Sequence, residues 1–156
     1  MNQPARSKAR SAARLAAVQA LYQQHMEGTA LIKLLDEFHQ HRLGRTIDDD
    51  AFDDAEYVDA EVPFFDDVVR GVDARRDEID ALVSAKLAAG WSLTRLDKAM
   101  LQVLRAGTYE LLARADVPVA VAISEYVDVA KAFFDDGQAK FVNGILDSVA
   151  KDARSV

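Results

Sequence analysis

The segment ARSAARLAAVQALY, residues 9–22, decides the fold class of this sequence. Its alanines are strong helix formers. Leu15, Val18 and Tyr22 recur at the three- and four-residue spacing that places side chains on one face of an α-helix. The pattern predicts a helix over about 7–28, which ends at a glycine.

Apolar residues keep the same spacing along the rest of the chain. No segment of useful length alternates with the two-residue period of a strand. Seven glycines and three prolines are too few for many short strands joined by turns. We therefore expect an all-α fold, a compact helical bundle of six to seven helices in a single domain over 1–156. After the first helix, the expected helices lie at about 31–41, 63–87, 93–112, 119–134 and, after a turn at 135–137, up to about 149.

Glycine and proline refine the third of these helices. Pro63 is well placed in its first turn, where its missing N–H has no helical partner to lose. Gly71, inside the same apolar run, either loosens the helix or lets another helix cross closely. Gly90 is the expected stop.

The composition excludes several classes of protein. The chain has no cysteine, so it has no disulfide, thiolate metal site or cysteine nucleophile. His25, His39 and His41 are too few and too scattered for a zinc site. No serine, histidine and aspartate have the spacing of a catalytic triad, and no glycine-rich loop could hold a phosphate. We expect no enzyme activity, no metal and no cofactor.

The hydropathy pattern bears on the location of the protein. No run approaches the ~18 apolar residues that a membrane span needs. Charges occupy the N-terminal stretch that would be apolar in a signal peptide. We expect a cytoplasmic protein that does not associate with membranes.

The net charge of −7 is unevenly distributed. A basic N-terminal arm, about 1–8, is expected to be disordered or frayed, whereas acidic residues crowd an expected exposed loop at about 43–61. A calcium loop counted from Asp48 would need glycine and glutamate where Asp53 and Asp59 stand, so a plain acidic loop is favoured. A basic arm on an acidic body favours a short, positioned contact with a nucleic acid.

Two segments carry more than an amphipathic pattern: ARSAARLAAVQALY at 9–22 and KFVNGILD at 140–147. Between them stand LR at 104–105, YELL at 109–112 and DVP at 116–118. Together these motifs resemble the NusB family of bacterial transcription antitermination proteins. The resemblance covers nearly the whole chain except the acidic loop.

The resemblance implies an all-helical fold of two small bundles and no catalysis. The family binds boxA, a short single-stranded RNA element in the leaders of ribosomal RNA operons. It does so with NusE, a ribosomal small-subunit protein, in the RNA polymerase antitermination complex. We accordingly predict RNA binding by Arg6, Lys8, Arg10, Arg14, Tyr22, Lys140, Phe141 and Asn143, and NusE binding by Asp97, Met100 and Arg105.

The residue types fit these roles, although some have alternative roles. Lysine and arginine contact phosphates without reading sequence, and aromatic rings stack on unpaired bases. Without the resemblance, the sequence favours neither base stacking nor packing for Tyr22. Without it, a buried position is also favoured for Phe141, whereas the resemblance favours RNA contact. One joint RNA site also requires the first and last helices to pack side by side. Packing roles are expected for Trp91, Tyr126, Phe133 and Phe134.

Three positions depart from the family pattern. Met100 stands where the family usually has an acid, so Asp97 is the expected substitute in the contact with NusE. Gly137 stands where the family often has an acid three residues before Lys140. Non-basic residues at 11–13 thin the arginine cluster, which predicts a smaller phosphate footprint.

Two other functions remain open at this point. A NusB-like helical domain also occurs fused to RNA cytosine methyltransferases, but that function requires a Rossmann-type catalytic domain downstream, so this sequence would have to be a fragment of such an enzyme. A helical adaptor that binds only protein is the other alternative. The sequence also leaves open whether the isolated protein is a monomer or a homodimer.

Overall fold

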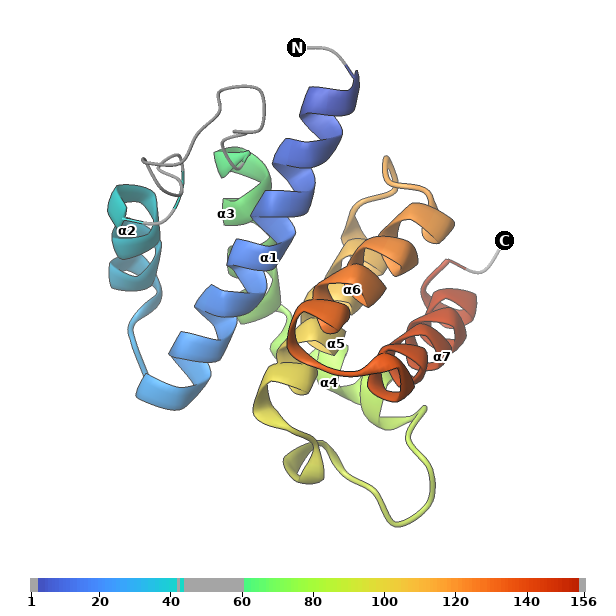
Figure 1. Ribbon diagram of the computed structural model, residues 1–156. Coiled ribbons are helices and arrows are strands. Elements are labelled where there is room, and N and C mark those ends of the chain that lie inside the picture. The colour runs from blue at the N-terminus through green and yellow to red at the C-terminus, as the bar shows by residue number, and fades with distance from the viewer. Residues whose placement is uncertain (1–2, 42, 44–60, 155–156) are drawn as a thin grey trace. The chain divides into compact units, whose positions relative to one another are not determined.

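The computed structural model describes residues 3–41, 43 and 61–154, with side chains from Ser7 onward. In those ranges it contains seven α-helices, a short 3-10 helix and no strand (Figure 1), which confirms the all-α prediction. The acidic loop and the calcium alternative lie outside the described residues, apart from Leu43 and Glu61. The helices are α1 (Gln3–Glu27), α2 (Leu31–His41), α3 (Val62–Ala74), α4 (Arg76–Ser84), α5 (Lys98–Ala113), α6 (Val119–Phe133) and α7 (Asp136–Ala153), with the 3-10 helix η2 at Leu93–Arg95.

The chain divides into two compact units, unit 1 at Met1–Arg70 and unit 2 at Gly71–Val156. In unit 1, Val18 and Leu21 of α1 are buried, as is Phe38 of α2. The Phe38 ring stacks on Phe65 of α3 with 5.5 Å between ring centroids. Gly28 adopts a left-handed conformation directly after α1, with φ of 70°, and thus provides the predicted helix stop.

Helix α5 forms the centre of unit 2 and contacts α4, α6 and α7. Every residue from Met100 to Leu111 is buried, as expected for a helix that is covered on all sides. Among its buried polar groups, the Glu110 carboxylate accepts a 2.5 Å hydrogen bond from the Tyr126 hydroxyl. At the other end of unit 2, the Arg154 guanidinium donates to the carbonyl oxygens of Glu110, Leu111, Arg114 and Val117, which ties the end of α7 to the end of α5.

The third expected helix is interrupted, which the prediction of one helix over 63–87 missed. Arg75 has φ of −113° and ψ of 24°, outside the helical region, and separates α3 from α4. Gly71 on α3 permits a close approach, because a Cβ there would lie 2.1 Å from Cε1 of Tyr109 on α5. Of the two roles predicted for Gly71, the structure supports the close crossing.

Other local predictions also need correction. Helix α1 begins at Gln3, so residues 3–8 are helical rather than the disordered or frayed arm expected, and Pro4 lies in the first turn, where proline is tolerated. Tyr126 is fully buried as predicted, but Phe133 is 42% exposed because it is the last residue of α6.

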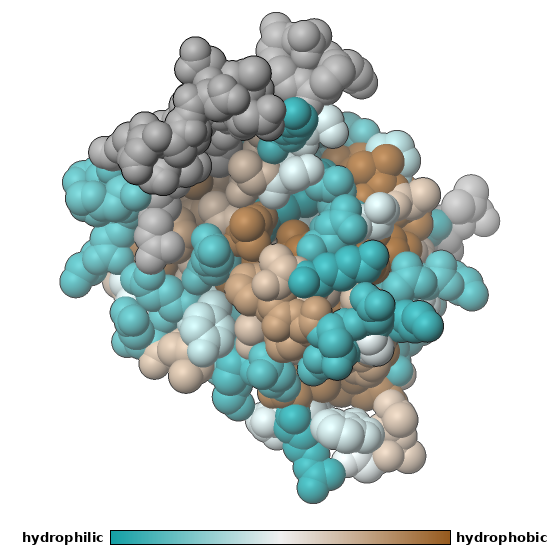
Figure 2. Space-filling model, viewed as in Figure 1, coloured by the Kyte–Doolittle hydropathy of each residue, from teal (hydrophilic) through white to brown (hydrophobic). Residues whose placement is uncertain are grey.

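Figure 2 shows hydrophobic side chains interspersed with hydrophilic ones on the visible face. None of the described helices has the length and apolar character to cross a membrane.

Candidate nucleic-acid interface

Helix α1 carries the first group of predicted RNA-binding residues. Lys8 is exposed, and Tyr22 exposes 41% of its surface further along the helix. An exposed tyrosine favours the stacking role over the packing role. Arg6 also belongs to α1, although its side chain lies outside the described part of the chain.

Arg10 and Arg14 are held against α3 of the same unit. Their guanidinium carbons lie 4.6 and 4.9 Å from the centroid of the Phe64 ring. Arg10 also forms an ion pair with Glu61, with 3.1 Å between Nε and Oε2, and the Glu61 N–H donates to the Ala9 carbonyl. These contacts fix the chain that enters α3 against α1.

The two arginines differ in their access to a ligand. The side chain of Arg10 is 25% exposed, so a phosphate could reach it by exchanging with the Glu61 carboxylate. Arg14 is only 3% exposed. Its position over Phe64 therefore suits a packing role, in which the guanidinium stacks on the aromatic face.

Helix α7 carries the second group, and its start is well defined. The Asp135 side chain accepts from the Gln138 N–H at 3.1 Å, while Gln138 Oε1 accepts from the Asp135 N–H at 3.4 Å, which together form a capping box. Lys140, Phe141 and Asn143 follow within two turns, and all three are exposed.

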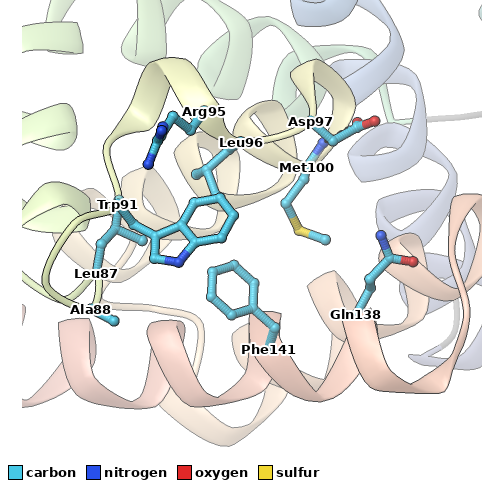
Figure 3. Close-up of a pocket in the computed structure, with 9 residues that line it drawn as sticks. All are labelled: Leu87, Ala88, Trp91, Arg95, Leu96, Asp97, Met100, Gln138 and Phe141. Atoms are coloured by element: carbon cyan, nitrogen blue, oxygen red, sulfur yellow. Dashed lines mark hydrogen bonds between the residues drawn. The ribbon is translucent and has the colours of Figure 1, made fainter.

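Phe141 lies in a groove of unit 2 rather than in the core. It is 38% exposed, so the buried alternative is wrong. The groove has a volume of about 400 Å³ and opens between the start of α7 and the segment that joins α4 to α5 (Figure 3). It is lined by Leu87, Ala88, Trp91, Arg95, Leu96, Asp97, Met100, Gln138 and Phe141.

Asn143 faces a different hollow from Phe141. It lines a second depression of unit 2 between α6 and α7, together with Lys131, Asp128 and Asp147. Asn143 lies two positions after Phe141, which on a helix turns the side chains to nearly opposite directions. The structure therefore does not bring Phe141 and Asn143 into one pocket. The prediction that α1 and α7 form one joint site stays a prediction.

Trp91 is a groove residue that the sequence analysis assigned to packing, and this assignment is wrong. Its side chain is 56% exposed. It follows Gly90, which has φ of 89°, on the irregular segment between α4 and η2. A large aromatic residue directly after Gly90 was the available signal, because a glycine there indicates a connection that runs over the surface; α4 itself ends earlier, at Ser84.

The predicted partner-binding residues have structural roles in unit 2. Asp97 is the N-cap of α5, where its carboxylate accepts from the N–H groups of Ala99 and Met100 at 2.8 and 3.2 Å. Met100 is buried and lines the groove. Arg105 is 8% exposed and forms a bidentate ion pair with Asp80 of α4, at 2.8 and 2.9 Å. Asp97 is thus the exposed member of the set.

The described part of the chain contains no group of three or more histidine, cysteine, aspartate or glutamate side chains arranged to hold a metal ion. The chemistry of the exposed groups is that of binding: cations for phosphates, aromatic rings for bases and a carboxylate for a basic partner.

The model of the NusB family matches residues 11–151. The chain belongs to the NusB family. The matched range includes the α7 residues, the groove and the predicted partner contacts, whereas Arg6, Lys8 and Arg10 precede it.

Named relatives support this membership over nearly their full length. The transcription antitermination protein NusB of Novosphingobium aromaticivorans is 69% identical over 147 residues, which cover 94% of this chain and 96% of that protein. The protein of the same name from Sphingopyxis alaskensis is 62% identical over 149 residues, 96% of this chain and 97% of the relative.

Solved structures of NusB proteins share the fold. T. maritima NusB superposes with a TM-score of 0.72 at 33% identity and covers 97% of this chain and 94% of its own. A complex of antitermination factors NusB and NusE with dsRNA contains a chain with a TM-score of 0.74, which covers 93% of this chain and 98% of its own. At 24% identity, that second likeness concerns the fold alone.

Proposed function

We propose that this chain is a transcription antitermination factor that binds RNA together with NusE. The observation that carries the proposal is its 69% identity, over nearly the full length, to a protein named for transcription antitermination. A related fold has also been solved with NusE and dsRNA. The two relatives have nearly the same length as this chain and are named as NusB proteins. They therefore give no support to the alternative of a methyltransferase domain.

The exposed side chains support RNA as the ligand. Lys8, Tyr22, Lys140 and Phe141 combine cations with aromatic rings, the two chemistries that bind single-stranded RNA. On the resemblance, the RNA is of boxA type and the setting is the RNA polymerase antitermination complex in the cytoplasm. The chain would act there by binding alone, without catalysis.

Few cations and few rings make a modest site, so a second surface should matter. We expect weak RNA binding by the chain alone and much tighter binding when NusE is present, because two linked contacts act at high effective concentration. Calorimetric titration of a short boxA-type RNA, with and without purified NusE, tests this.

The outcomes of that titration are distinct. Tighter binding with NusE supports the proposal, and a scrambled RNA of the same composition serves as the control. Equal RNA affinity with and without NusE would count against the joint binding. Absence of RNA binding in both cases would favour the protein-only adaptor.

A further inference from the structure

Two exposed aromatic side chains of unit 2 line the same groove, and only one of them belongs to the sequence-predicted RNA site. Trp91 comes from the segment between α4 and η2, and Phe141 comes from α7. Figure 3 shows their rings on adjoining sides of the hollow. Large apolar rings this exposed lose much of the stabilisation that burial would give, which is typical of a ligand site.

The rest of the groove combines an apolar floor with a polar rim. Leu87, Leu96 and Met100 provide the apolar lining. Arg95 donates from Nη1 to the Gly90 carbonyl at 2.9 Å, which holds its guanidinium on the segment that carries Trp91. The rim is therefore cationic on the tryptophan side.

Gln138 adds a hydrogen-bond donor whose orientation is fixed. A backbone N–H can only donate, so the atom of Gln138 that faces the Asp135 N–H is the carbonyl oxygen Oε1. The amide nitrogen Nε2 points instead toward the Met100 side of the groove (Figure 3). Asp97 also lines the groove, but its carboxylate already accepts from two backbone N–H groups.

We propose that this groove binds one unpaired RNA base, with Trp91 and Phe141 contacting its faces. A base has flat π-faces for the two rings and acceptor atoms on its edge for Gln138, and the adjoining phosphate suits Arg95. A purely apolar side chain of a partner protein would leave the Arg95 cation and the Gln138 amide without matching groups. The inference rests on the proposed RNA binding and assigns Trp91 a role in it.

The groove then selects for single-stranded RNA. In a duplex, each base is stacked between its neighbours and paired on its edge, so it cannot enter a groove without being extruded. We expect the contribution of Trp91 to be lost when the same sequence is supplied fully paired.

The test uses Trp91→Ala, Trp91→Phe and the control Phe133→Ala, which removes an aromatic ring of similar exposure outside the groove. Each full-length variant is titrated with the single-stranded RNA in the presence of NusE, and thermal melting verifies the fold. Trp91→Ala should weaken RNA binding about 5- to 150-fold. Trp91→Phe should restore most of the affinity, and Phe133→Ala should bind like the wild type.

Two further readouts separate base stacking from a general structural role. Trp91 is the only tryptophan of the chain, so binding of RNA to the wild type should quench intrinsic fluorescence, provided that NusE without tryptophan is used. Because both rings contact one base, Trp91→Ala and Phe141→Ala combined should weaken binding by less than the product of their separate effects.

The outcomes distinguish this inference from the proposed function. If the wild type binds RNA but Trp91→Ala binds equally well and the fluorescence is unchanged, the groove does not hold a base and this inference is wrong. If Trp91→Ala weakens NusE binding without RNA, the groove takes a protein side chain instead. If the wild type binds no RNA, the proposed function and this inference fall together.

Discussion

Arg10 and Arg14 lie one helical turn apart and contact the same Phe64 ring, yet they differ in exposure. We expect Arg10→Ala to weaken binding to every RNA sequence and to lower the log–log salt slope by roughly 0.7, the value for one lost phosphate contact on a single strand. Arg14→Ala should mainly lower the melting temperature, because its buried guanidinium packs on Phe64. RNA titrations at several salt concentrations, with thermal melting, measure both effects.

The matched control for these arginines is Lys33→Ala. Lys33 is an exposed cation of α2 in the same unit, so its removal changes the net charge equally. If Lys33→Ala lowers the slope as much as Arg10→Ala does, the effect is one of net charge rather than a phosphate contact. An unchanged slope in Arg10→Ala would contradict its role.

At the scale of the element, two glycines inside helices have opposite surroundings. A Cβ at Gly71 would overlap the Tyr109 ring, whereas a Cβ at Gly144 of α7 would meet nothing within 4 Å. Gly71→Ala should destabilise the protein by about 1–3 kcal/mol through overpacking. Gly144→Ala should stabilise it by about 0.5–1 kcal/mol, because alanine has the higher helix propensity. Urea unfolding of the two variants measures these changes, and equal shifts would contradict the close crossing.

The start of α5 combines a structural role with a predicted partner contact, and two variants of Asp97 separate them. Asp97→Asn keeps a side-chain oxygen for the N-cap but removes the charge, so it should weaken NusE binding and leave the melting temperature nearly unchanged. Asp97→Ala should also lose about 1 kcal/mol of stability. Calorimetry with NusE, with Asp128→Asn on α6 as the charge control, checks this.

If Asp97→Asn binds NusE as tightly as the wild type does, the Asp97 charge does not contribute to the contact with NusE. In that case the role of Asp97 is to cap α5, where its carboxylate accepts from the first N–H groups of the helix.

Helical periodicity predicted most elements correctly because most helices bury a continuous apolar stripe, although α5 is covered on all sides. It also contained the information on Phe141, since the buried stripe of α7 runs through Val142, Ile145, Leu146 and Val149 and leaves Phe141 beside it. The break at Arg75 had no such signal, because neither glycine nor proline marks it. The structure places that break at a non-helical arginine, which pairs with Glu78 and lowers the pKa of the Glu78 carboxyl by a hydrogen bond.

At the scale of the whole molecule, the sequence pattern could not predict which residues far apart in the chain contact each other. The pairing of Arg10 with Glu61 joins positions 51 residues apart, and that of Arg105 with Asp80 joins positions 25 apart. Both arginines were predicted to bind other molecules, because composition shows a charge but not its tertiary partner. The resemblance supplied the RNA and NusE hypotheses, whereas the exposed Trp91 became visible only in the fold.

Helix α3 belongs to both units, which predicts how the chain unfolds. Its buried Phe65 and Val69 lie in unit 1 and its buried Val72 lies in unit 2, so neither unit can lose its part of α3 without disturbing the other. We expect one cooperative transition. Urea unfolding followed by Trp91 fluorescence, which reports on unit 2, should coincide with far-UV circular dichroism, which reports on all helices.

A variant in unit 1 makes this test of coupling sharper. Phe65→Leu removes part of a fully buried ring and should destabilise the protein by roughly 1–2 kcal/mol, whereas Ile32→Ala alters a residue that is 78% exposed and should change little. If the units unfold together, Phe65→Leu lowers the urea midpoint seen by Trp91 fluorescence although Trp91 lies in unit 2. A midpoint that shifts only in circular dichroism would show that the units unfold independently and that α3 does not couple them.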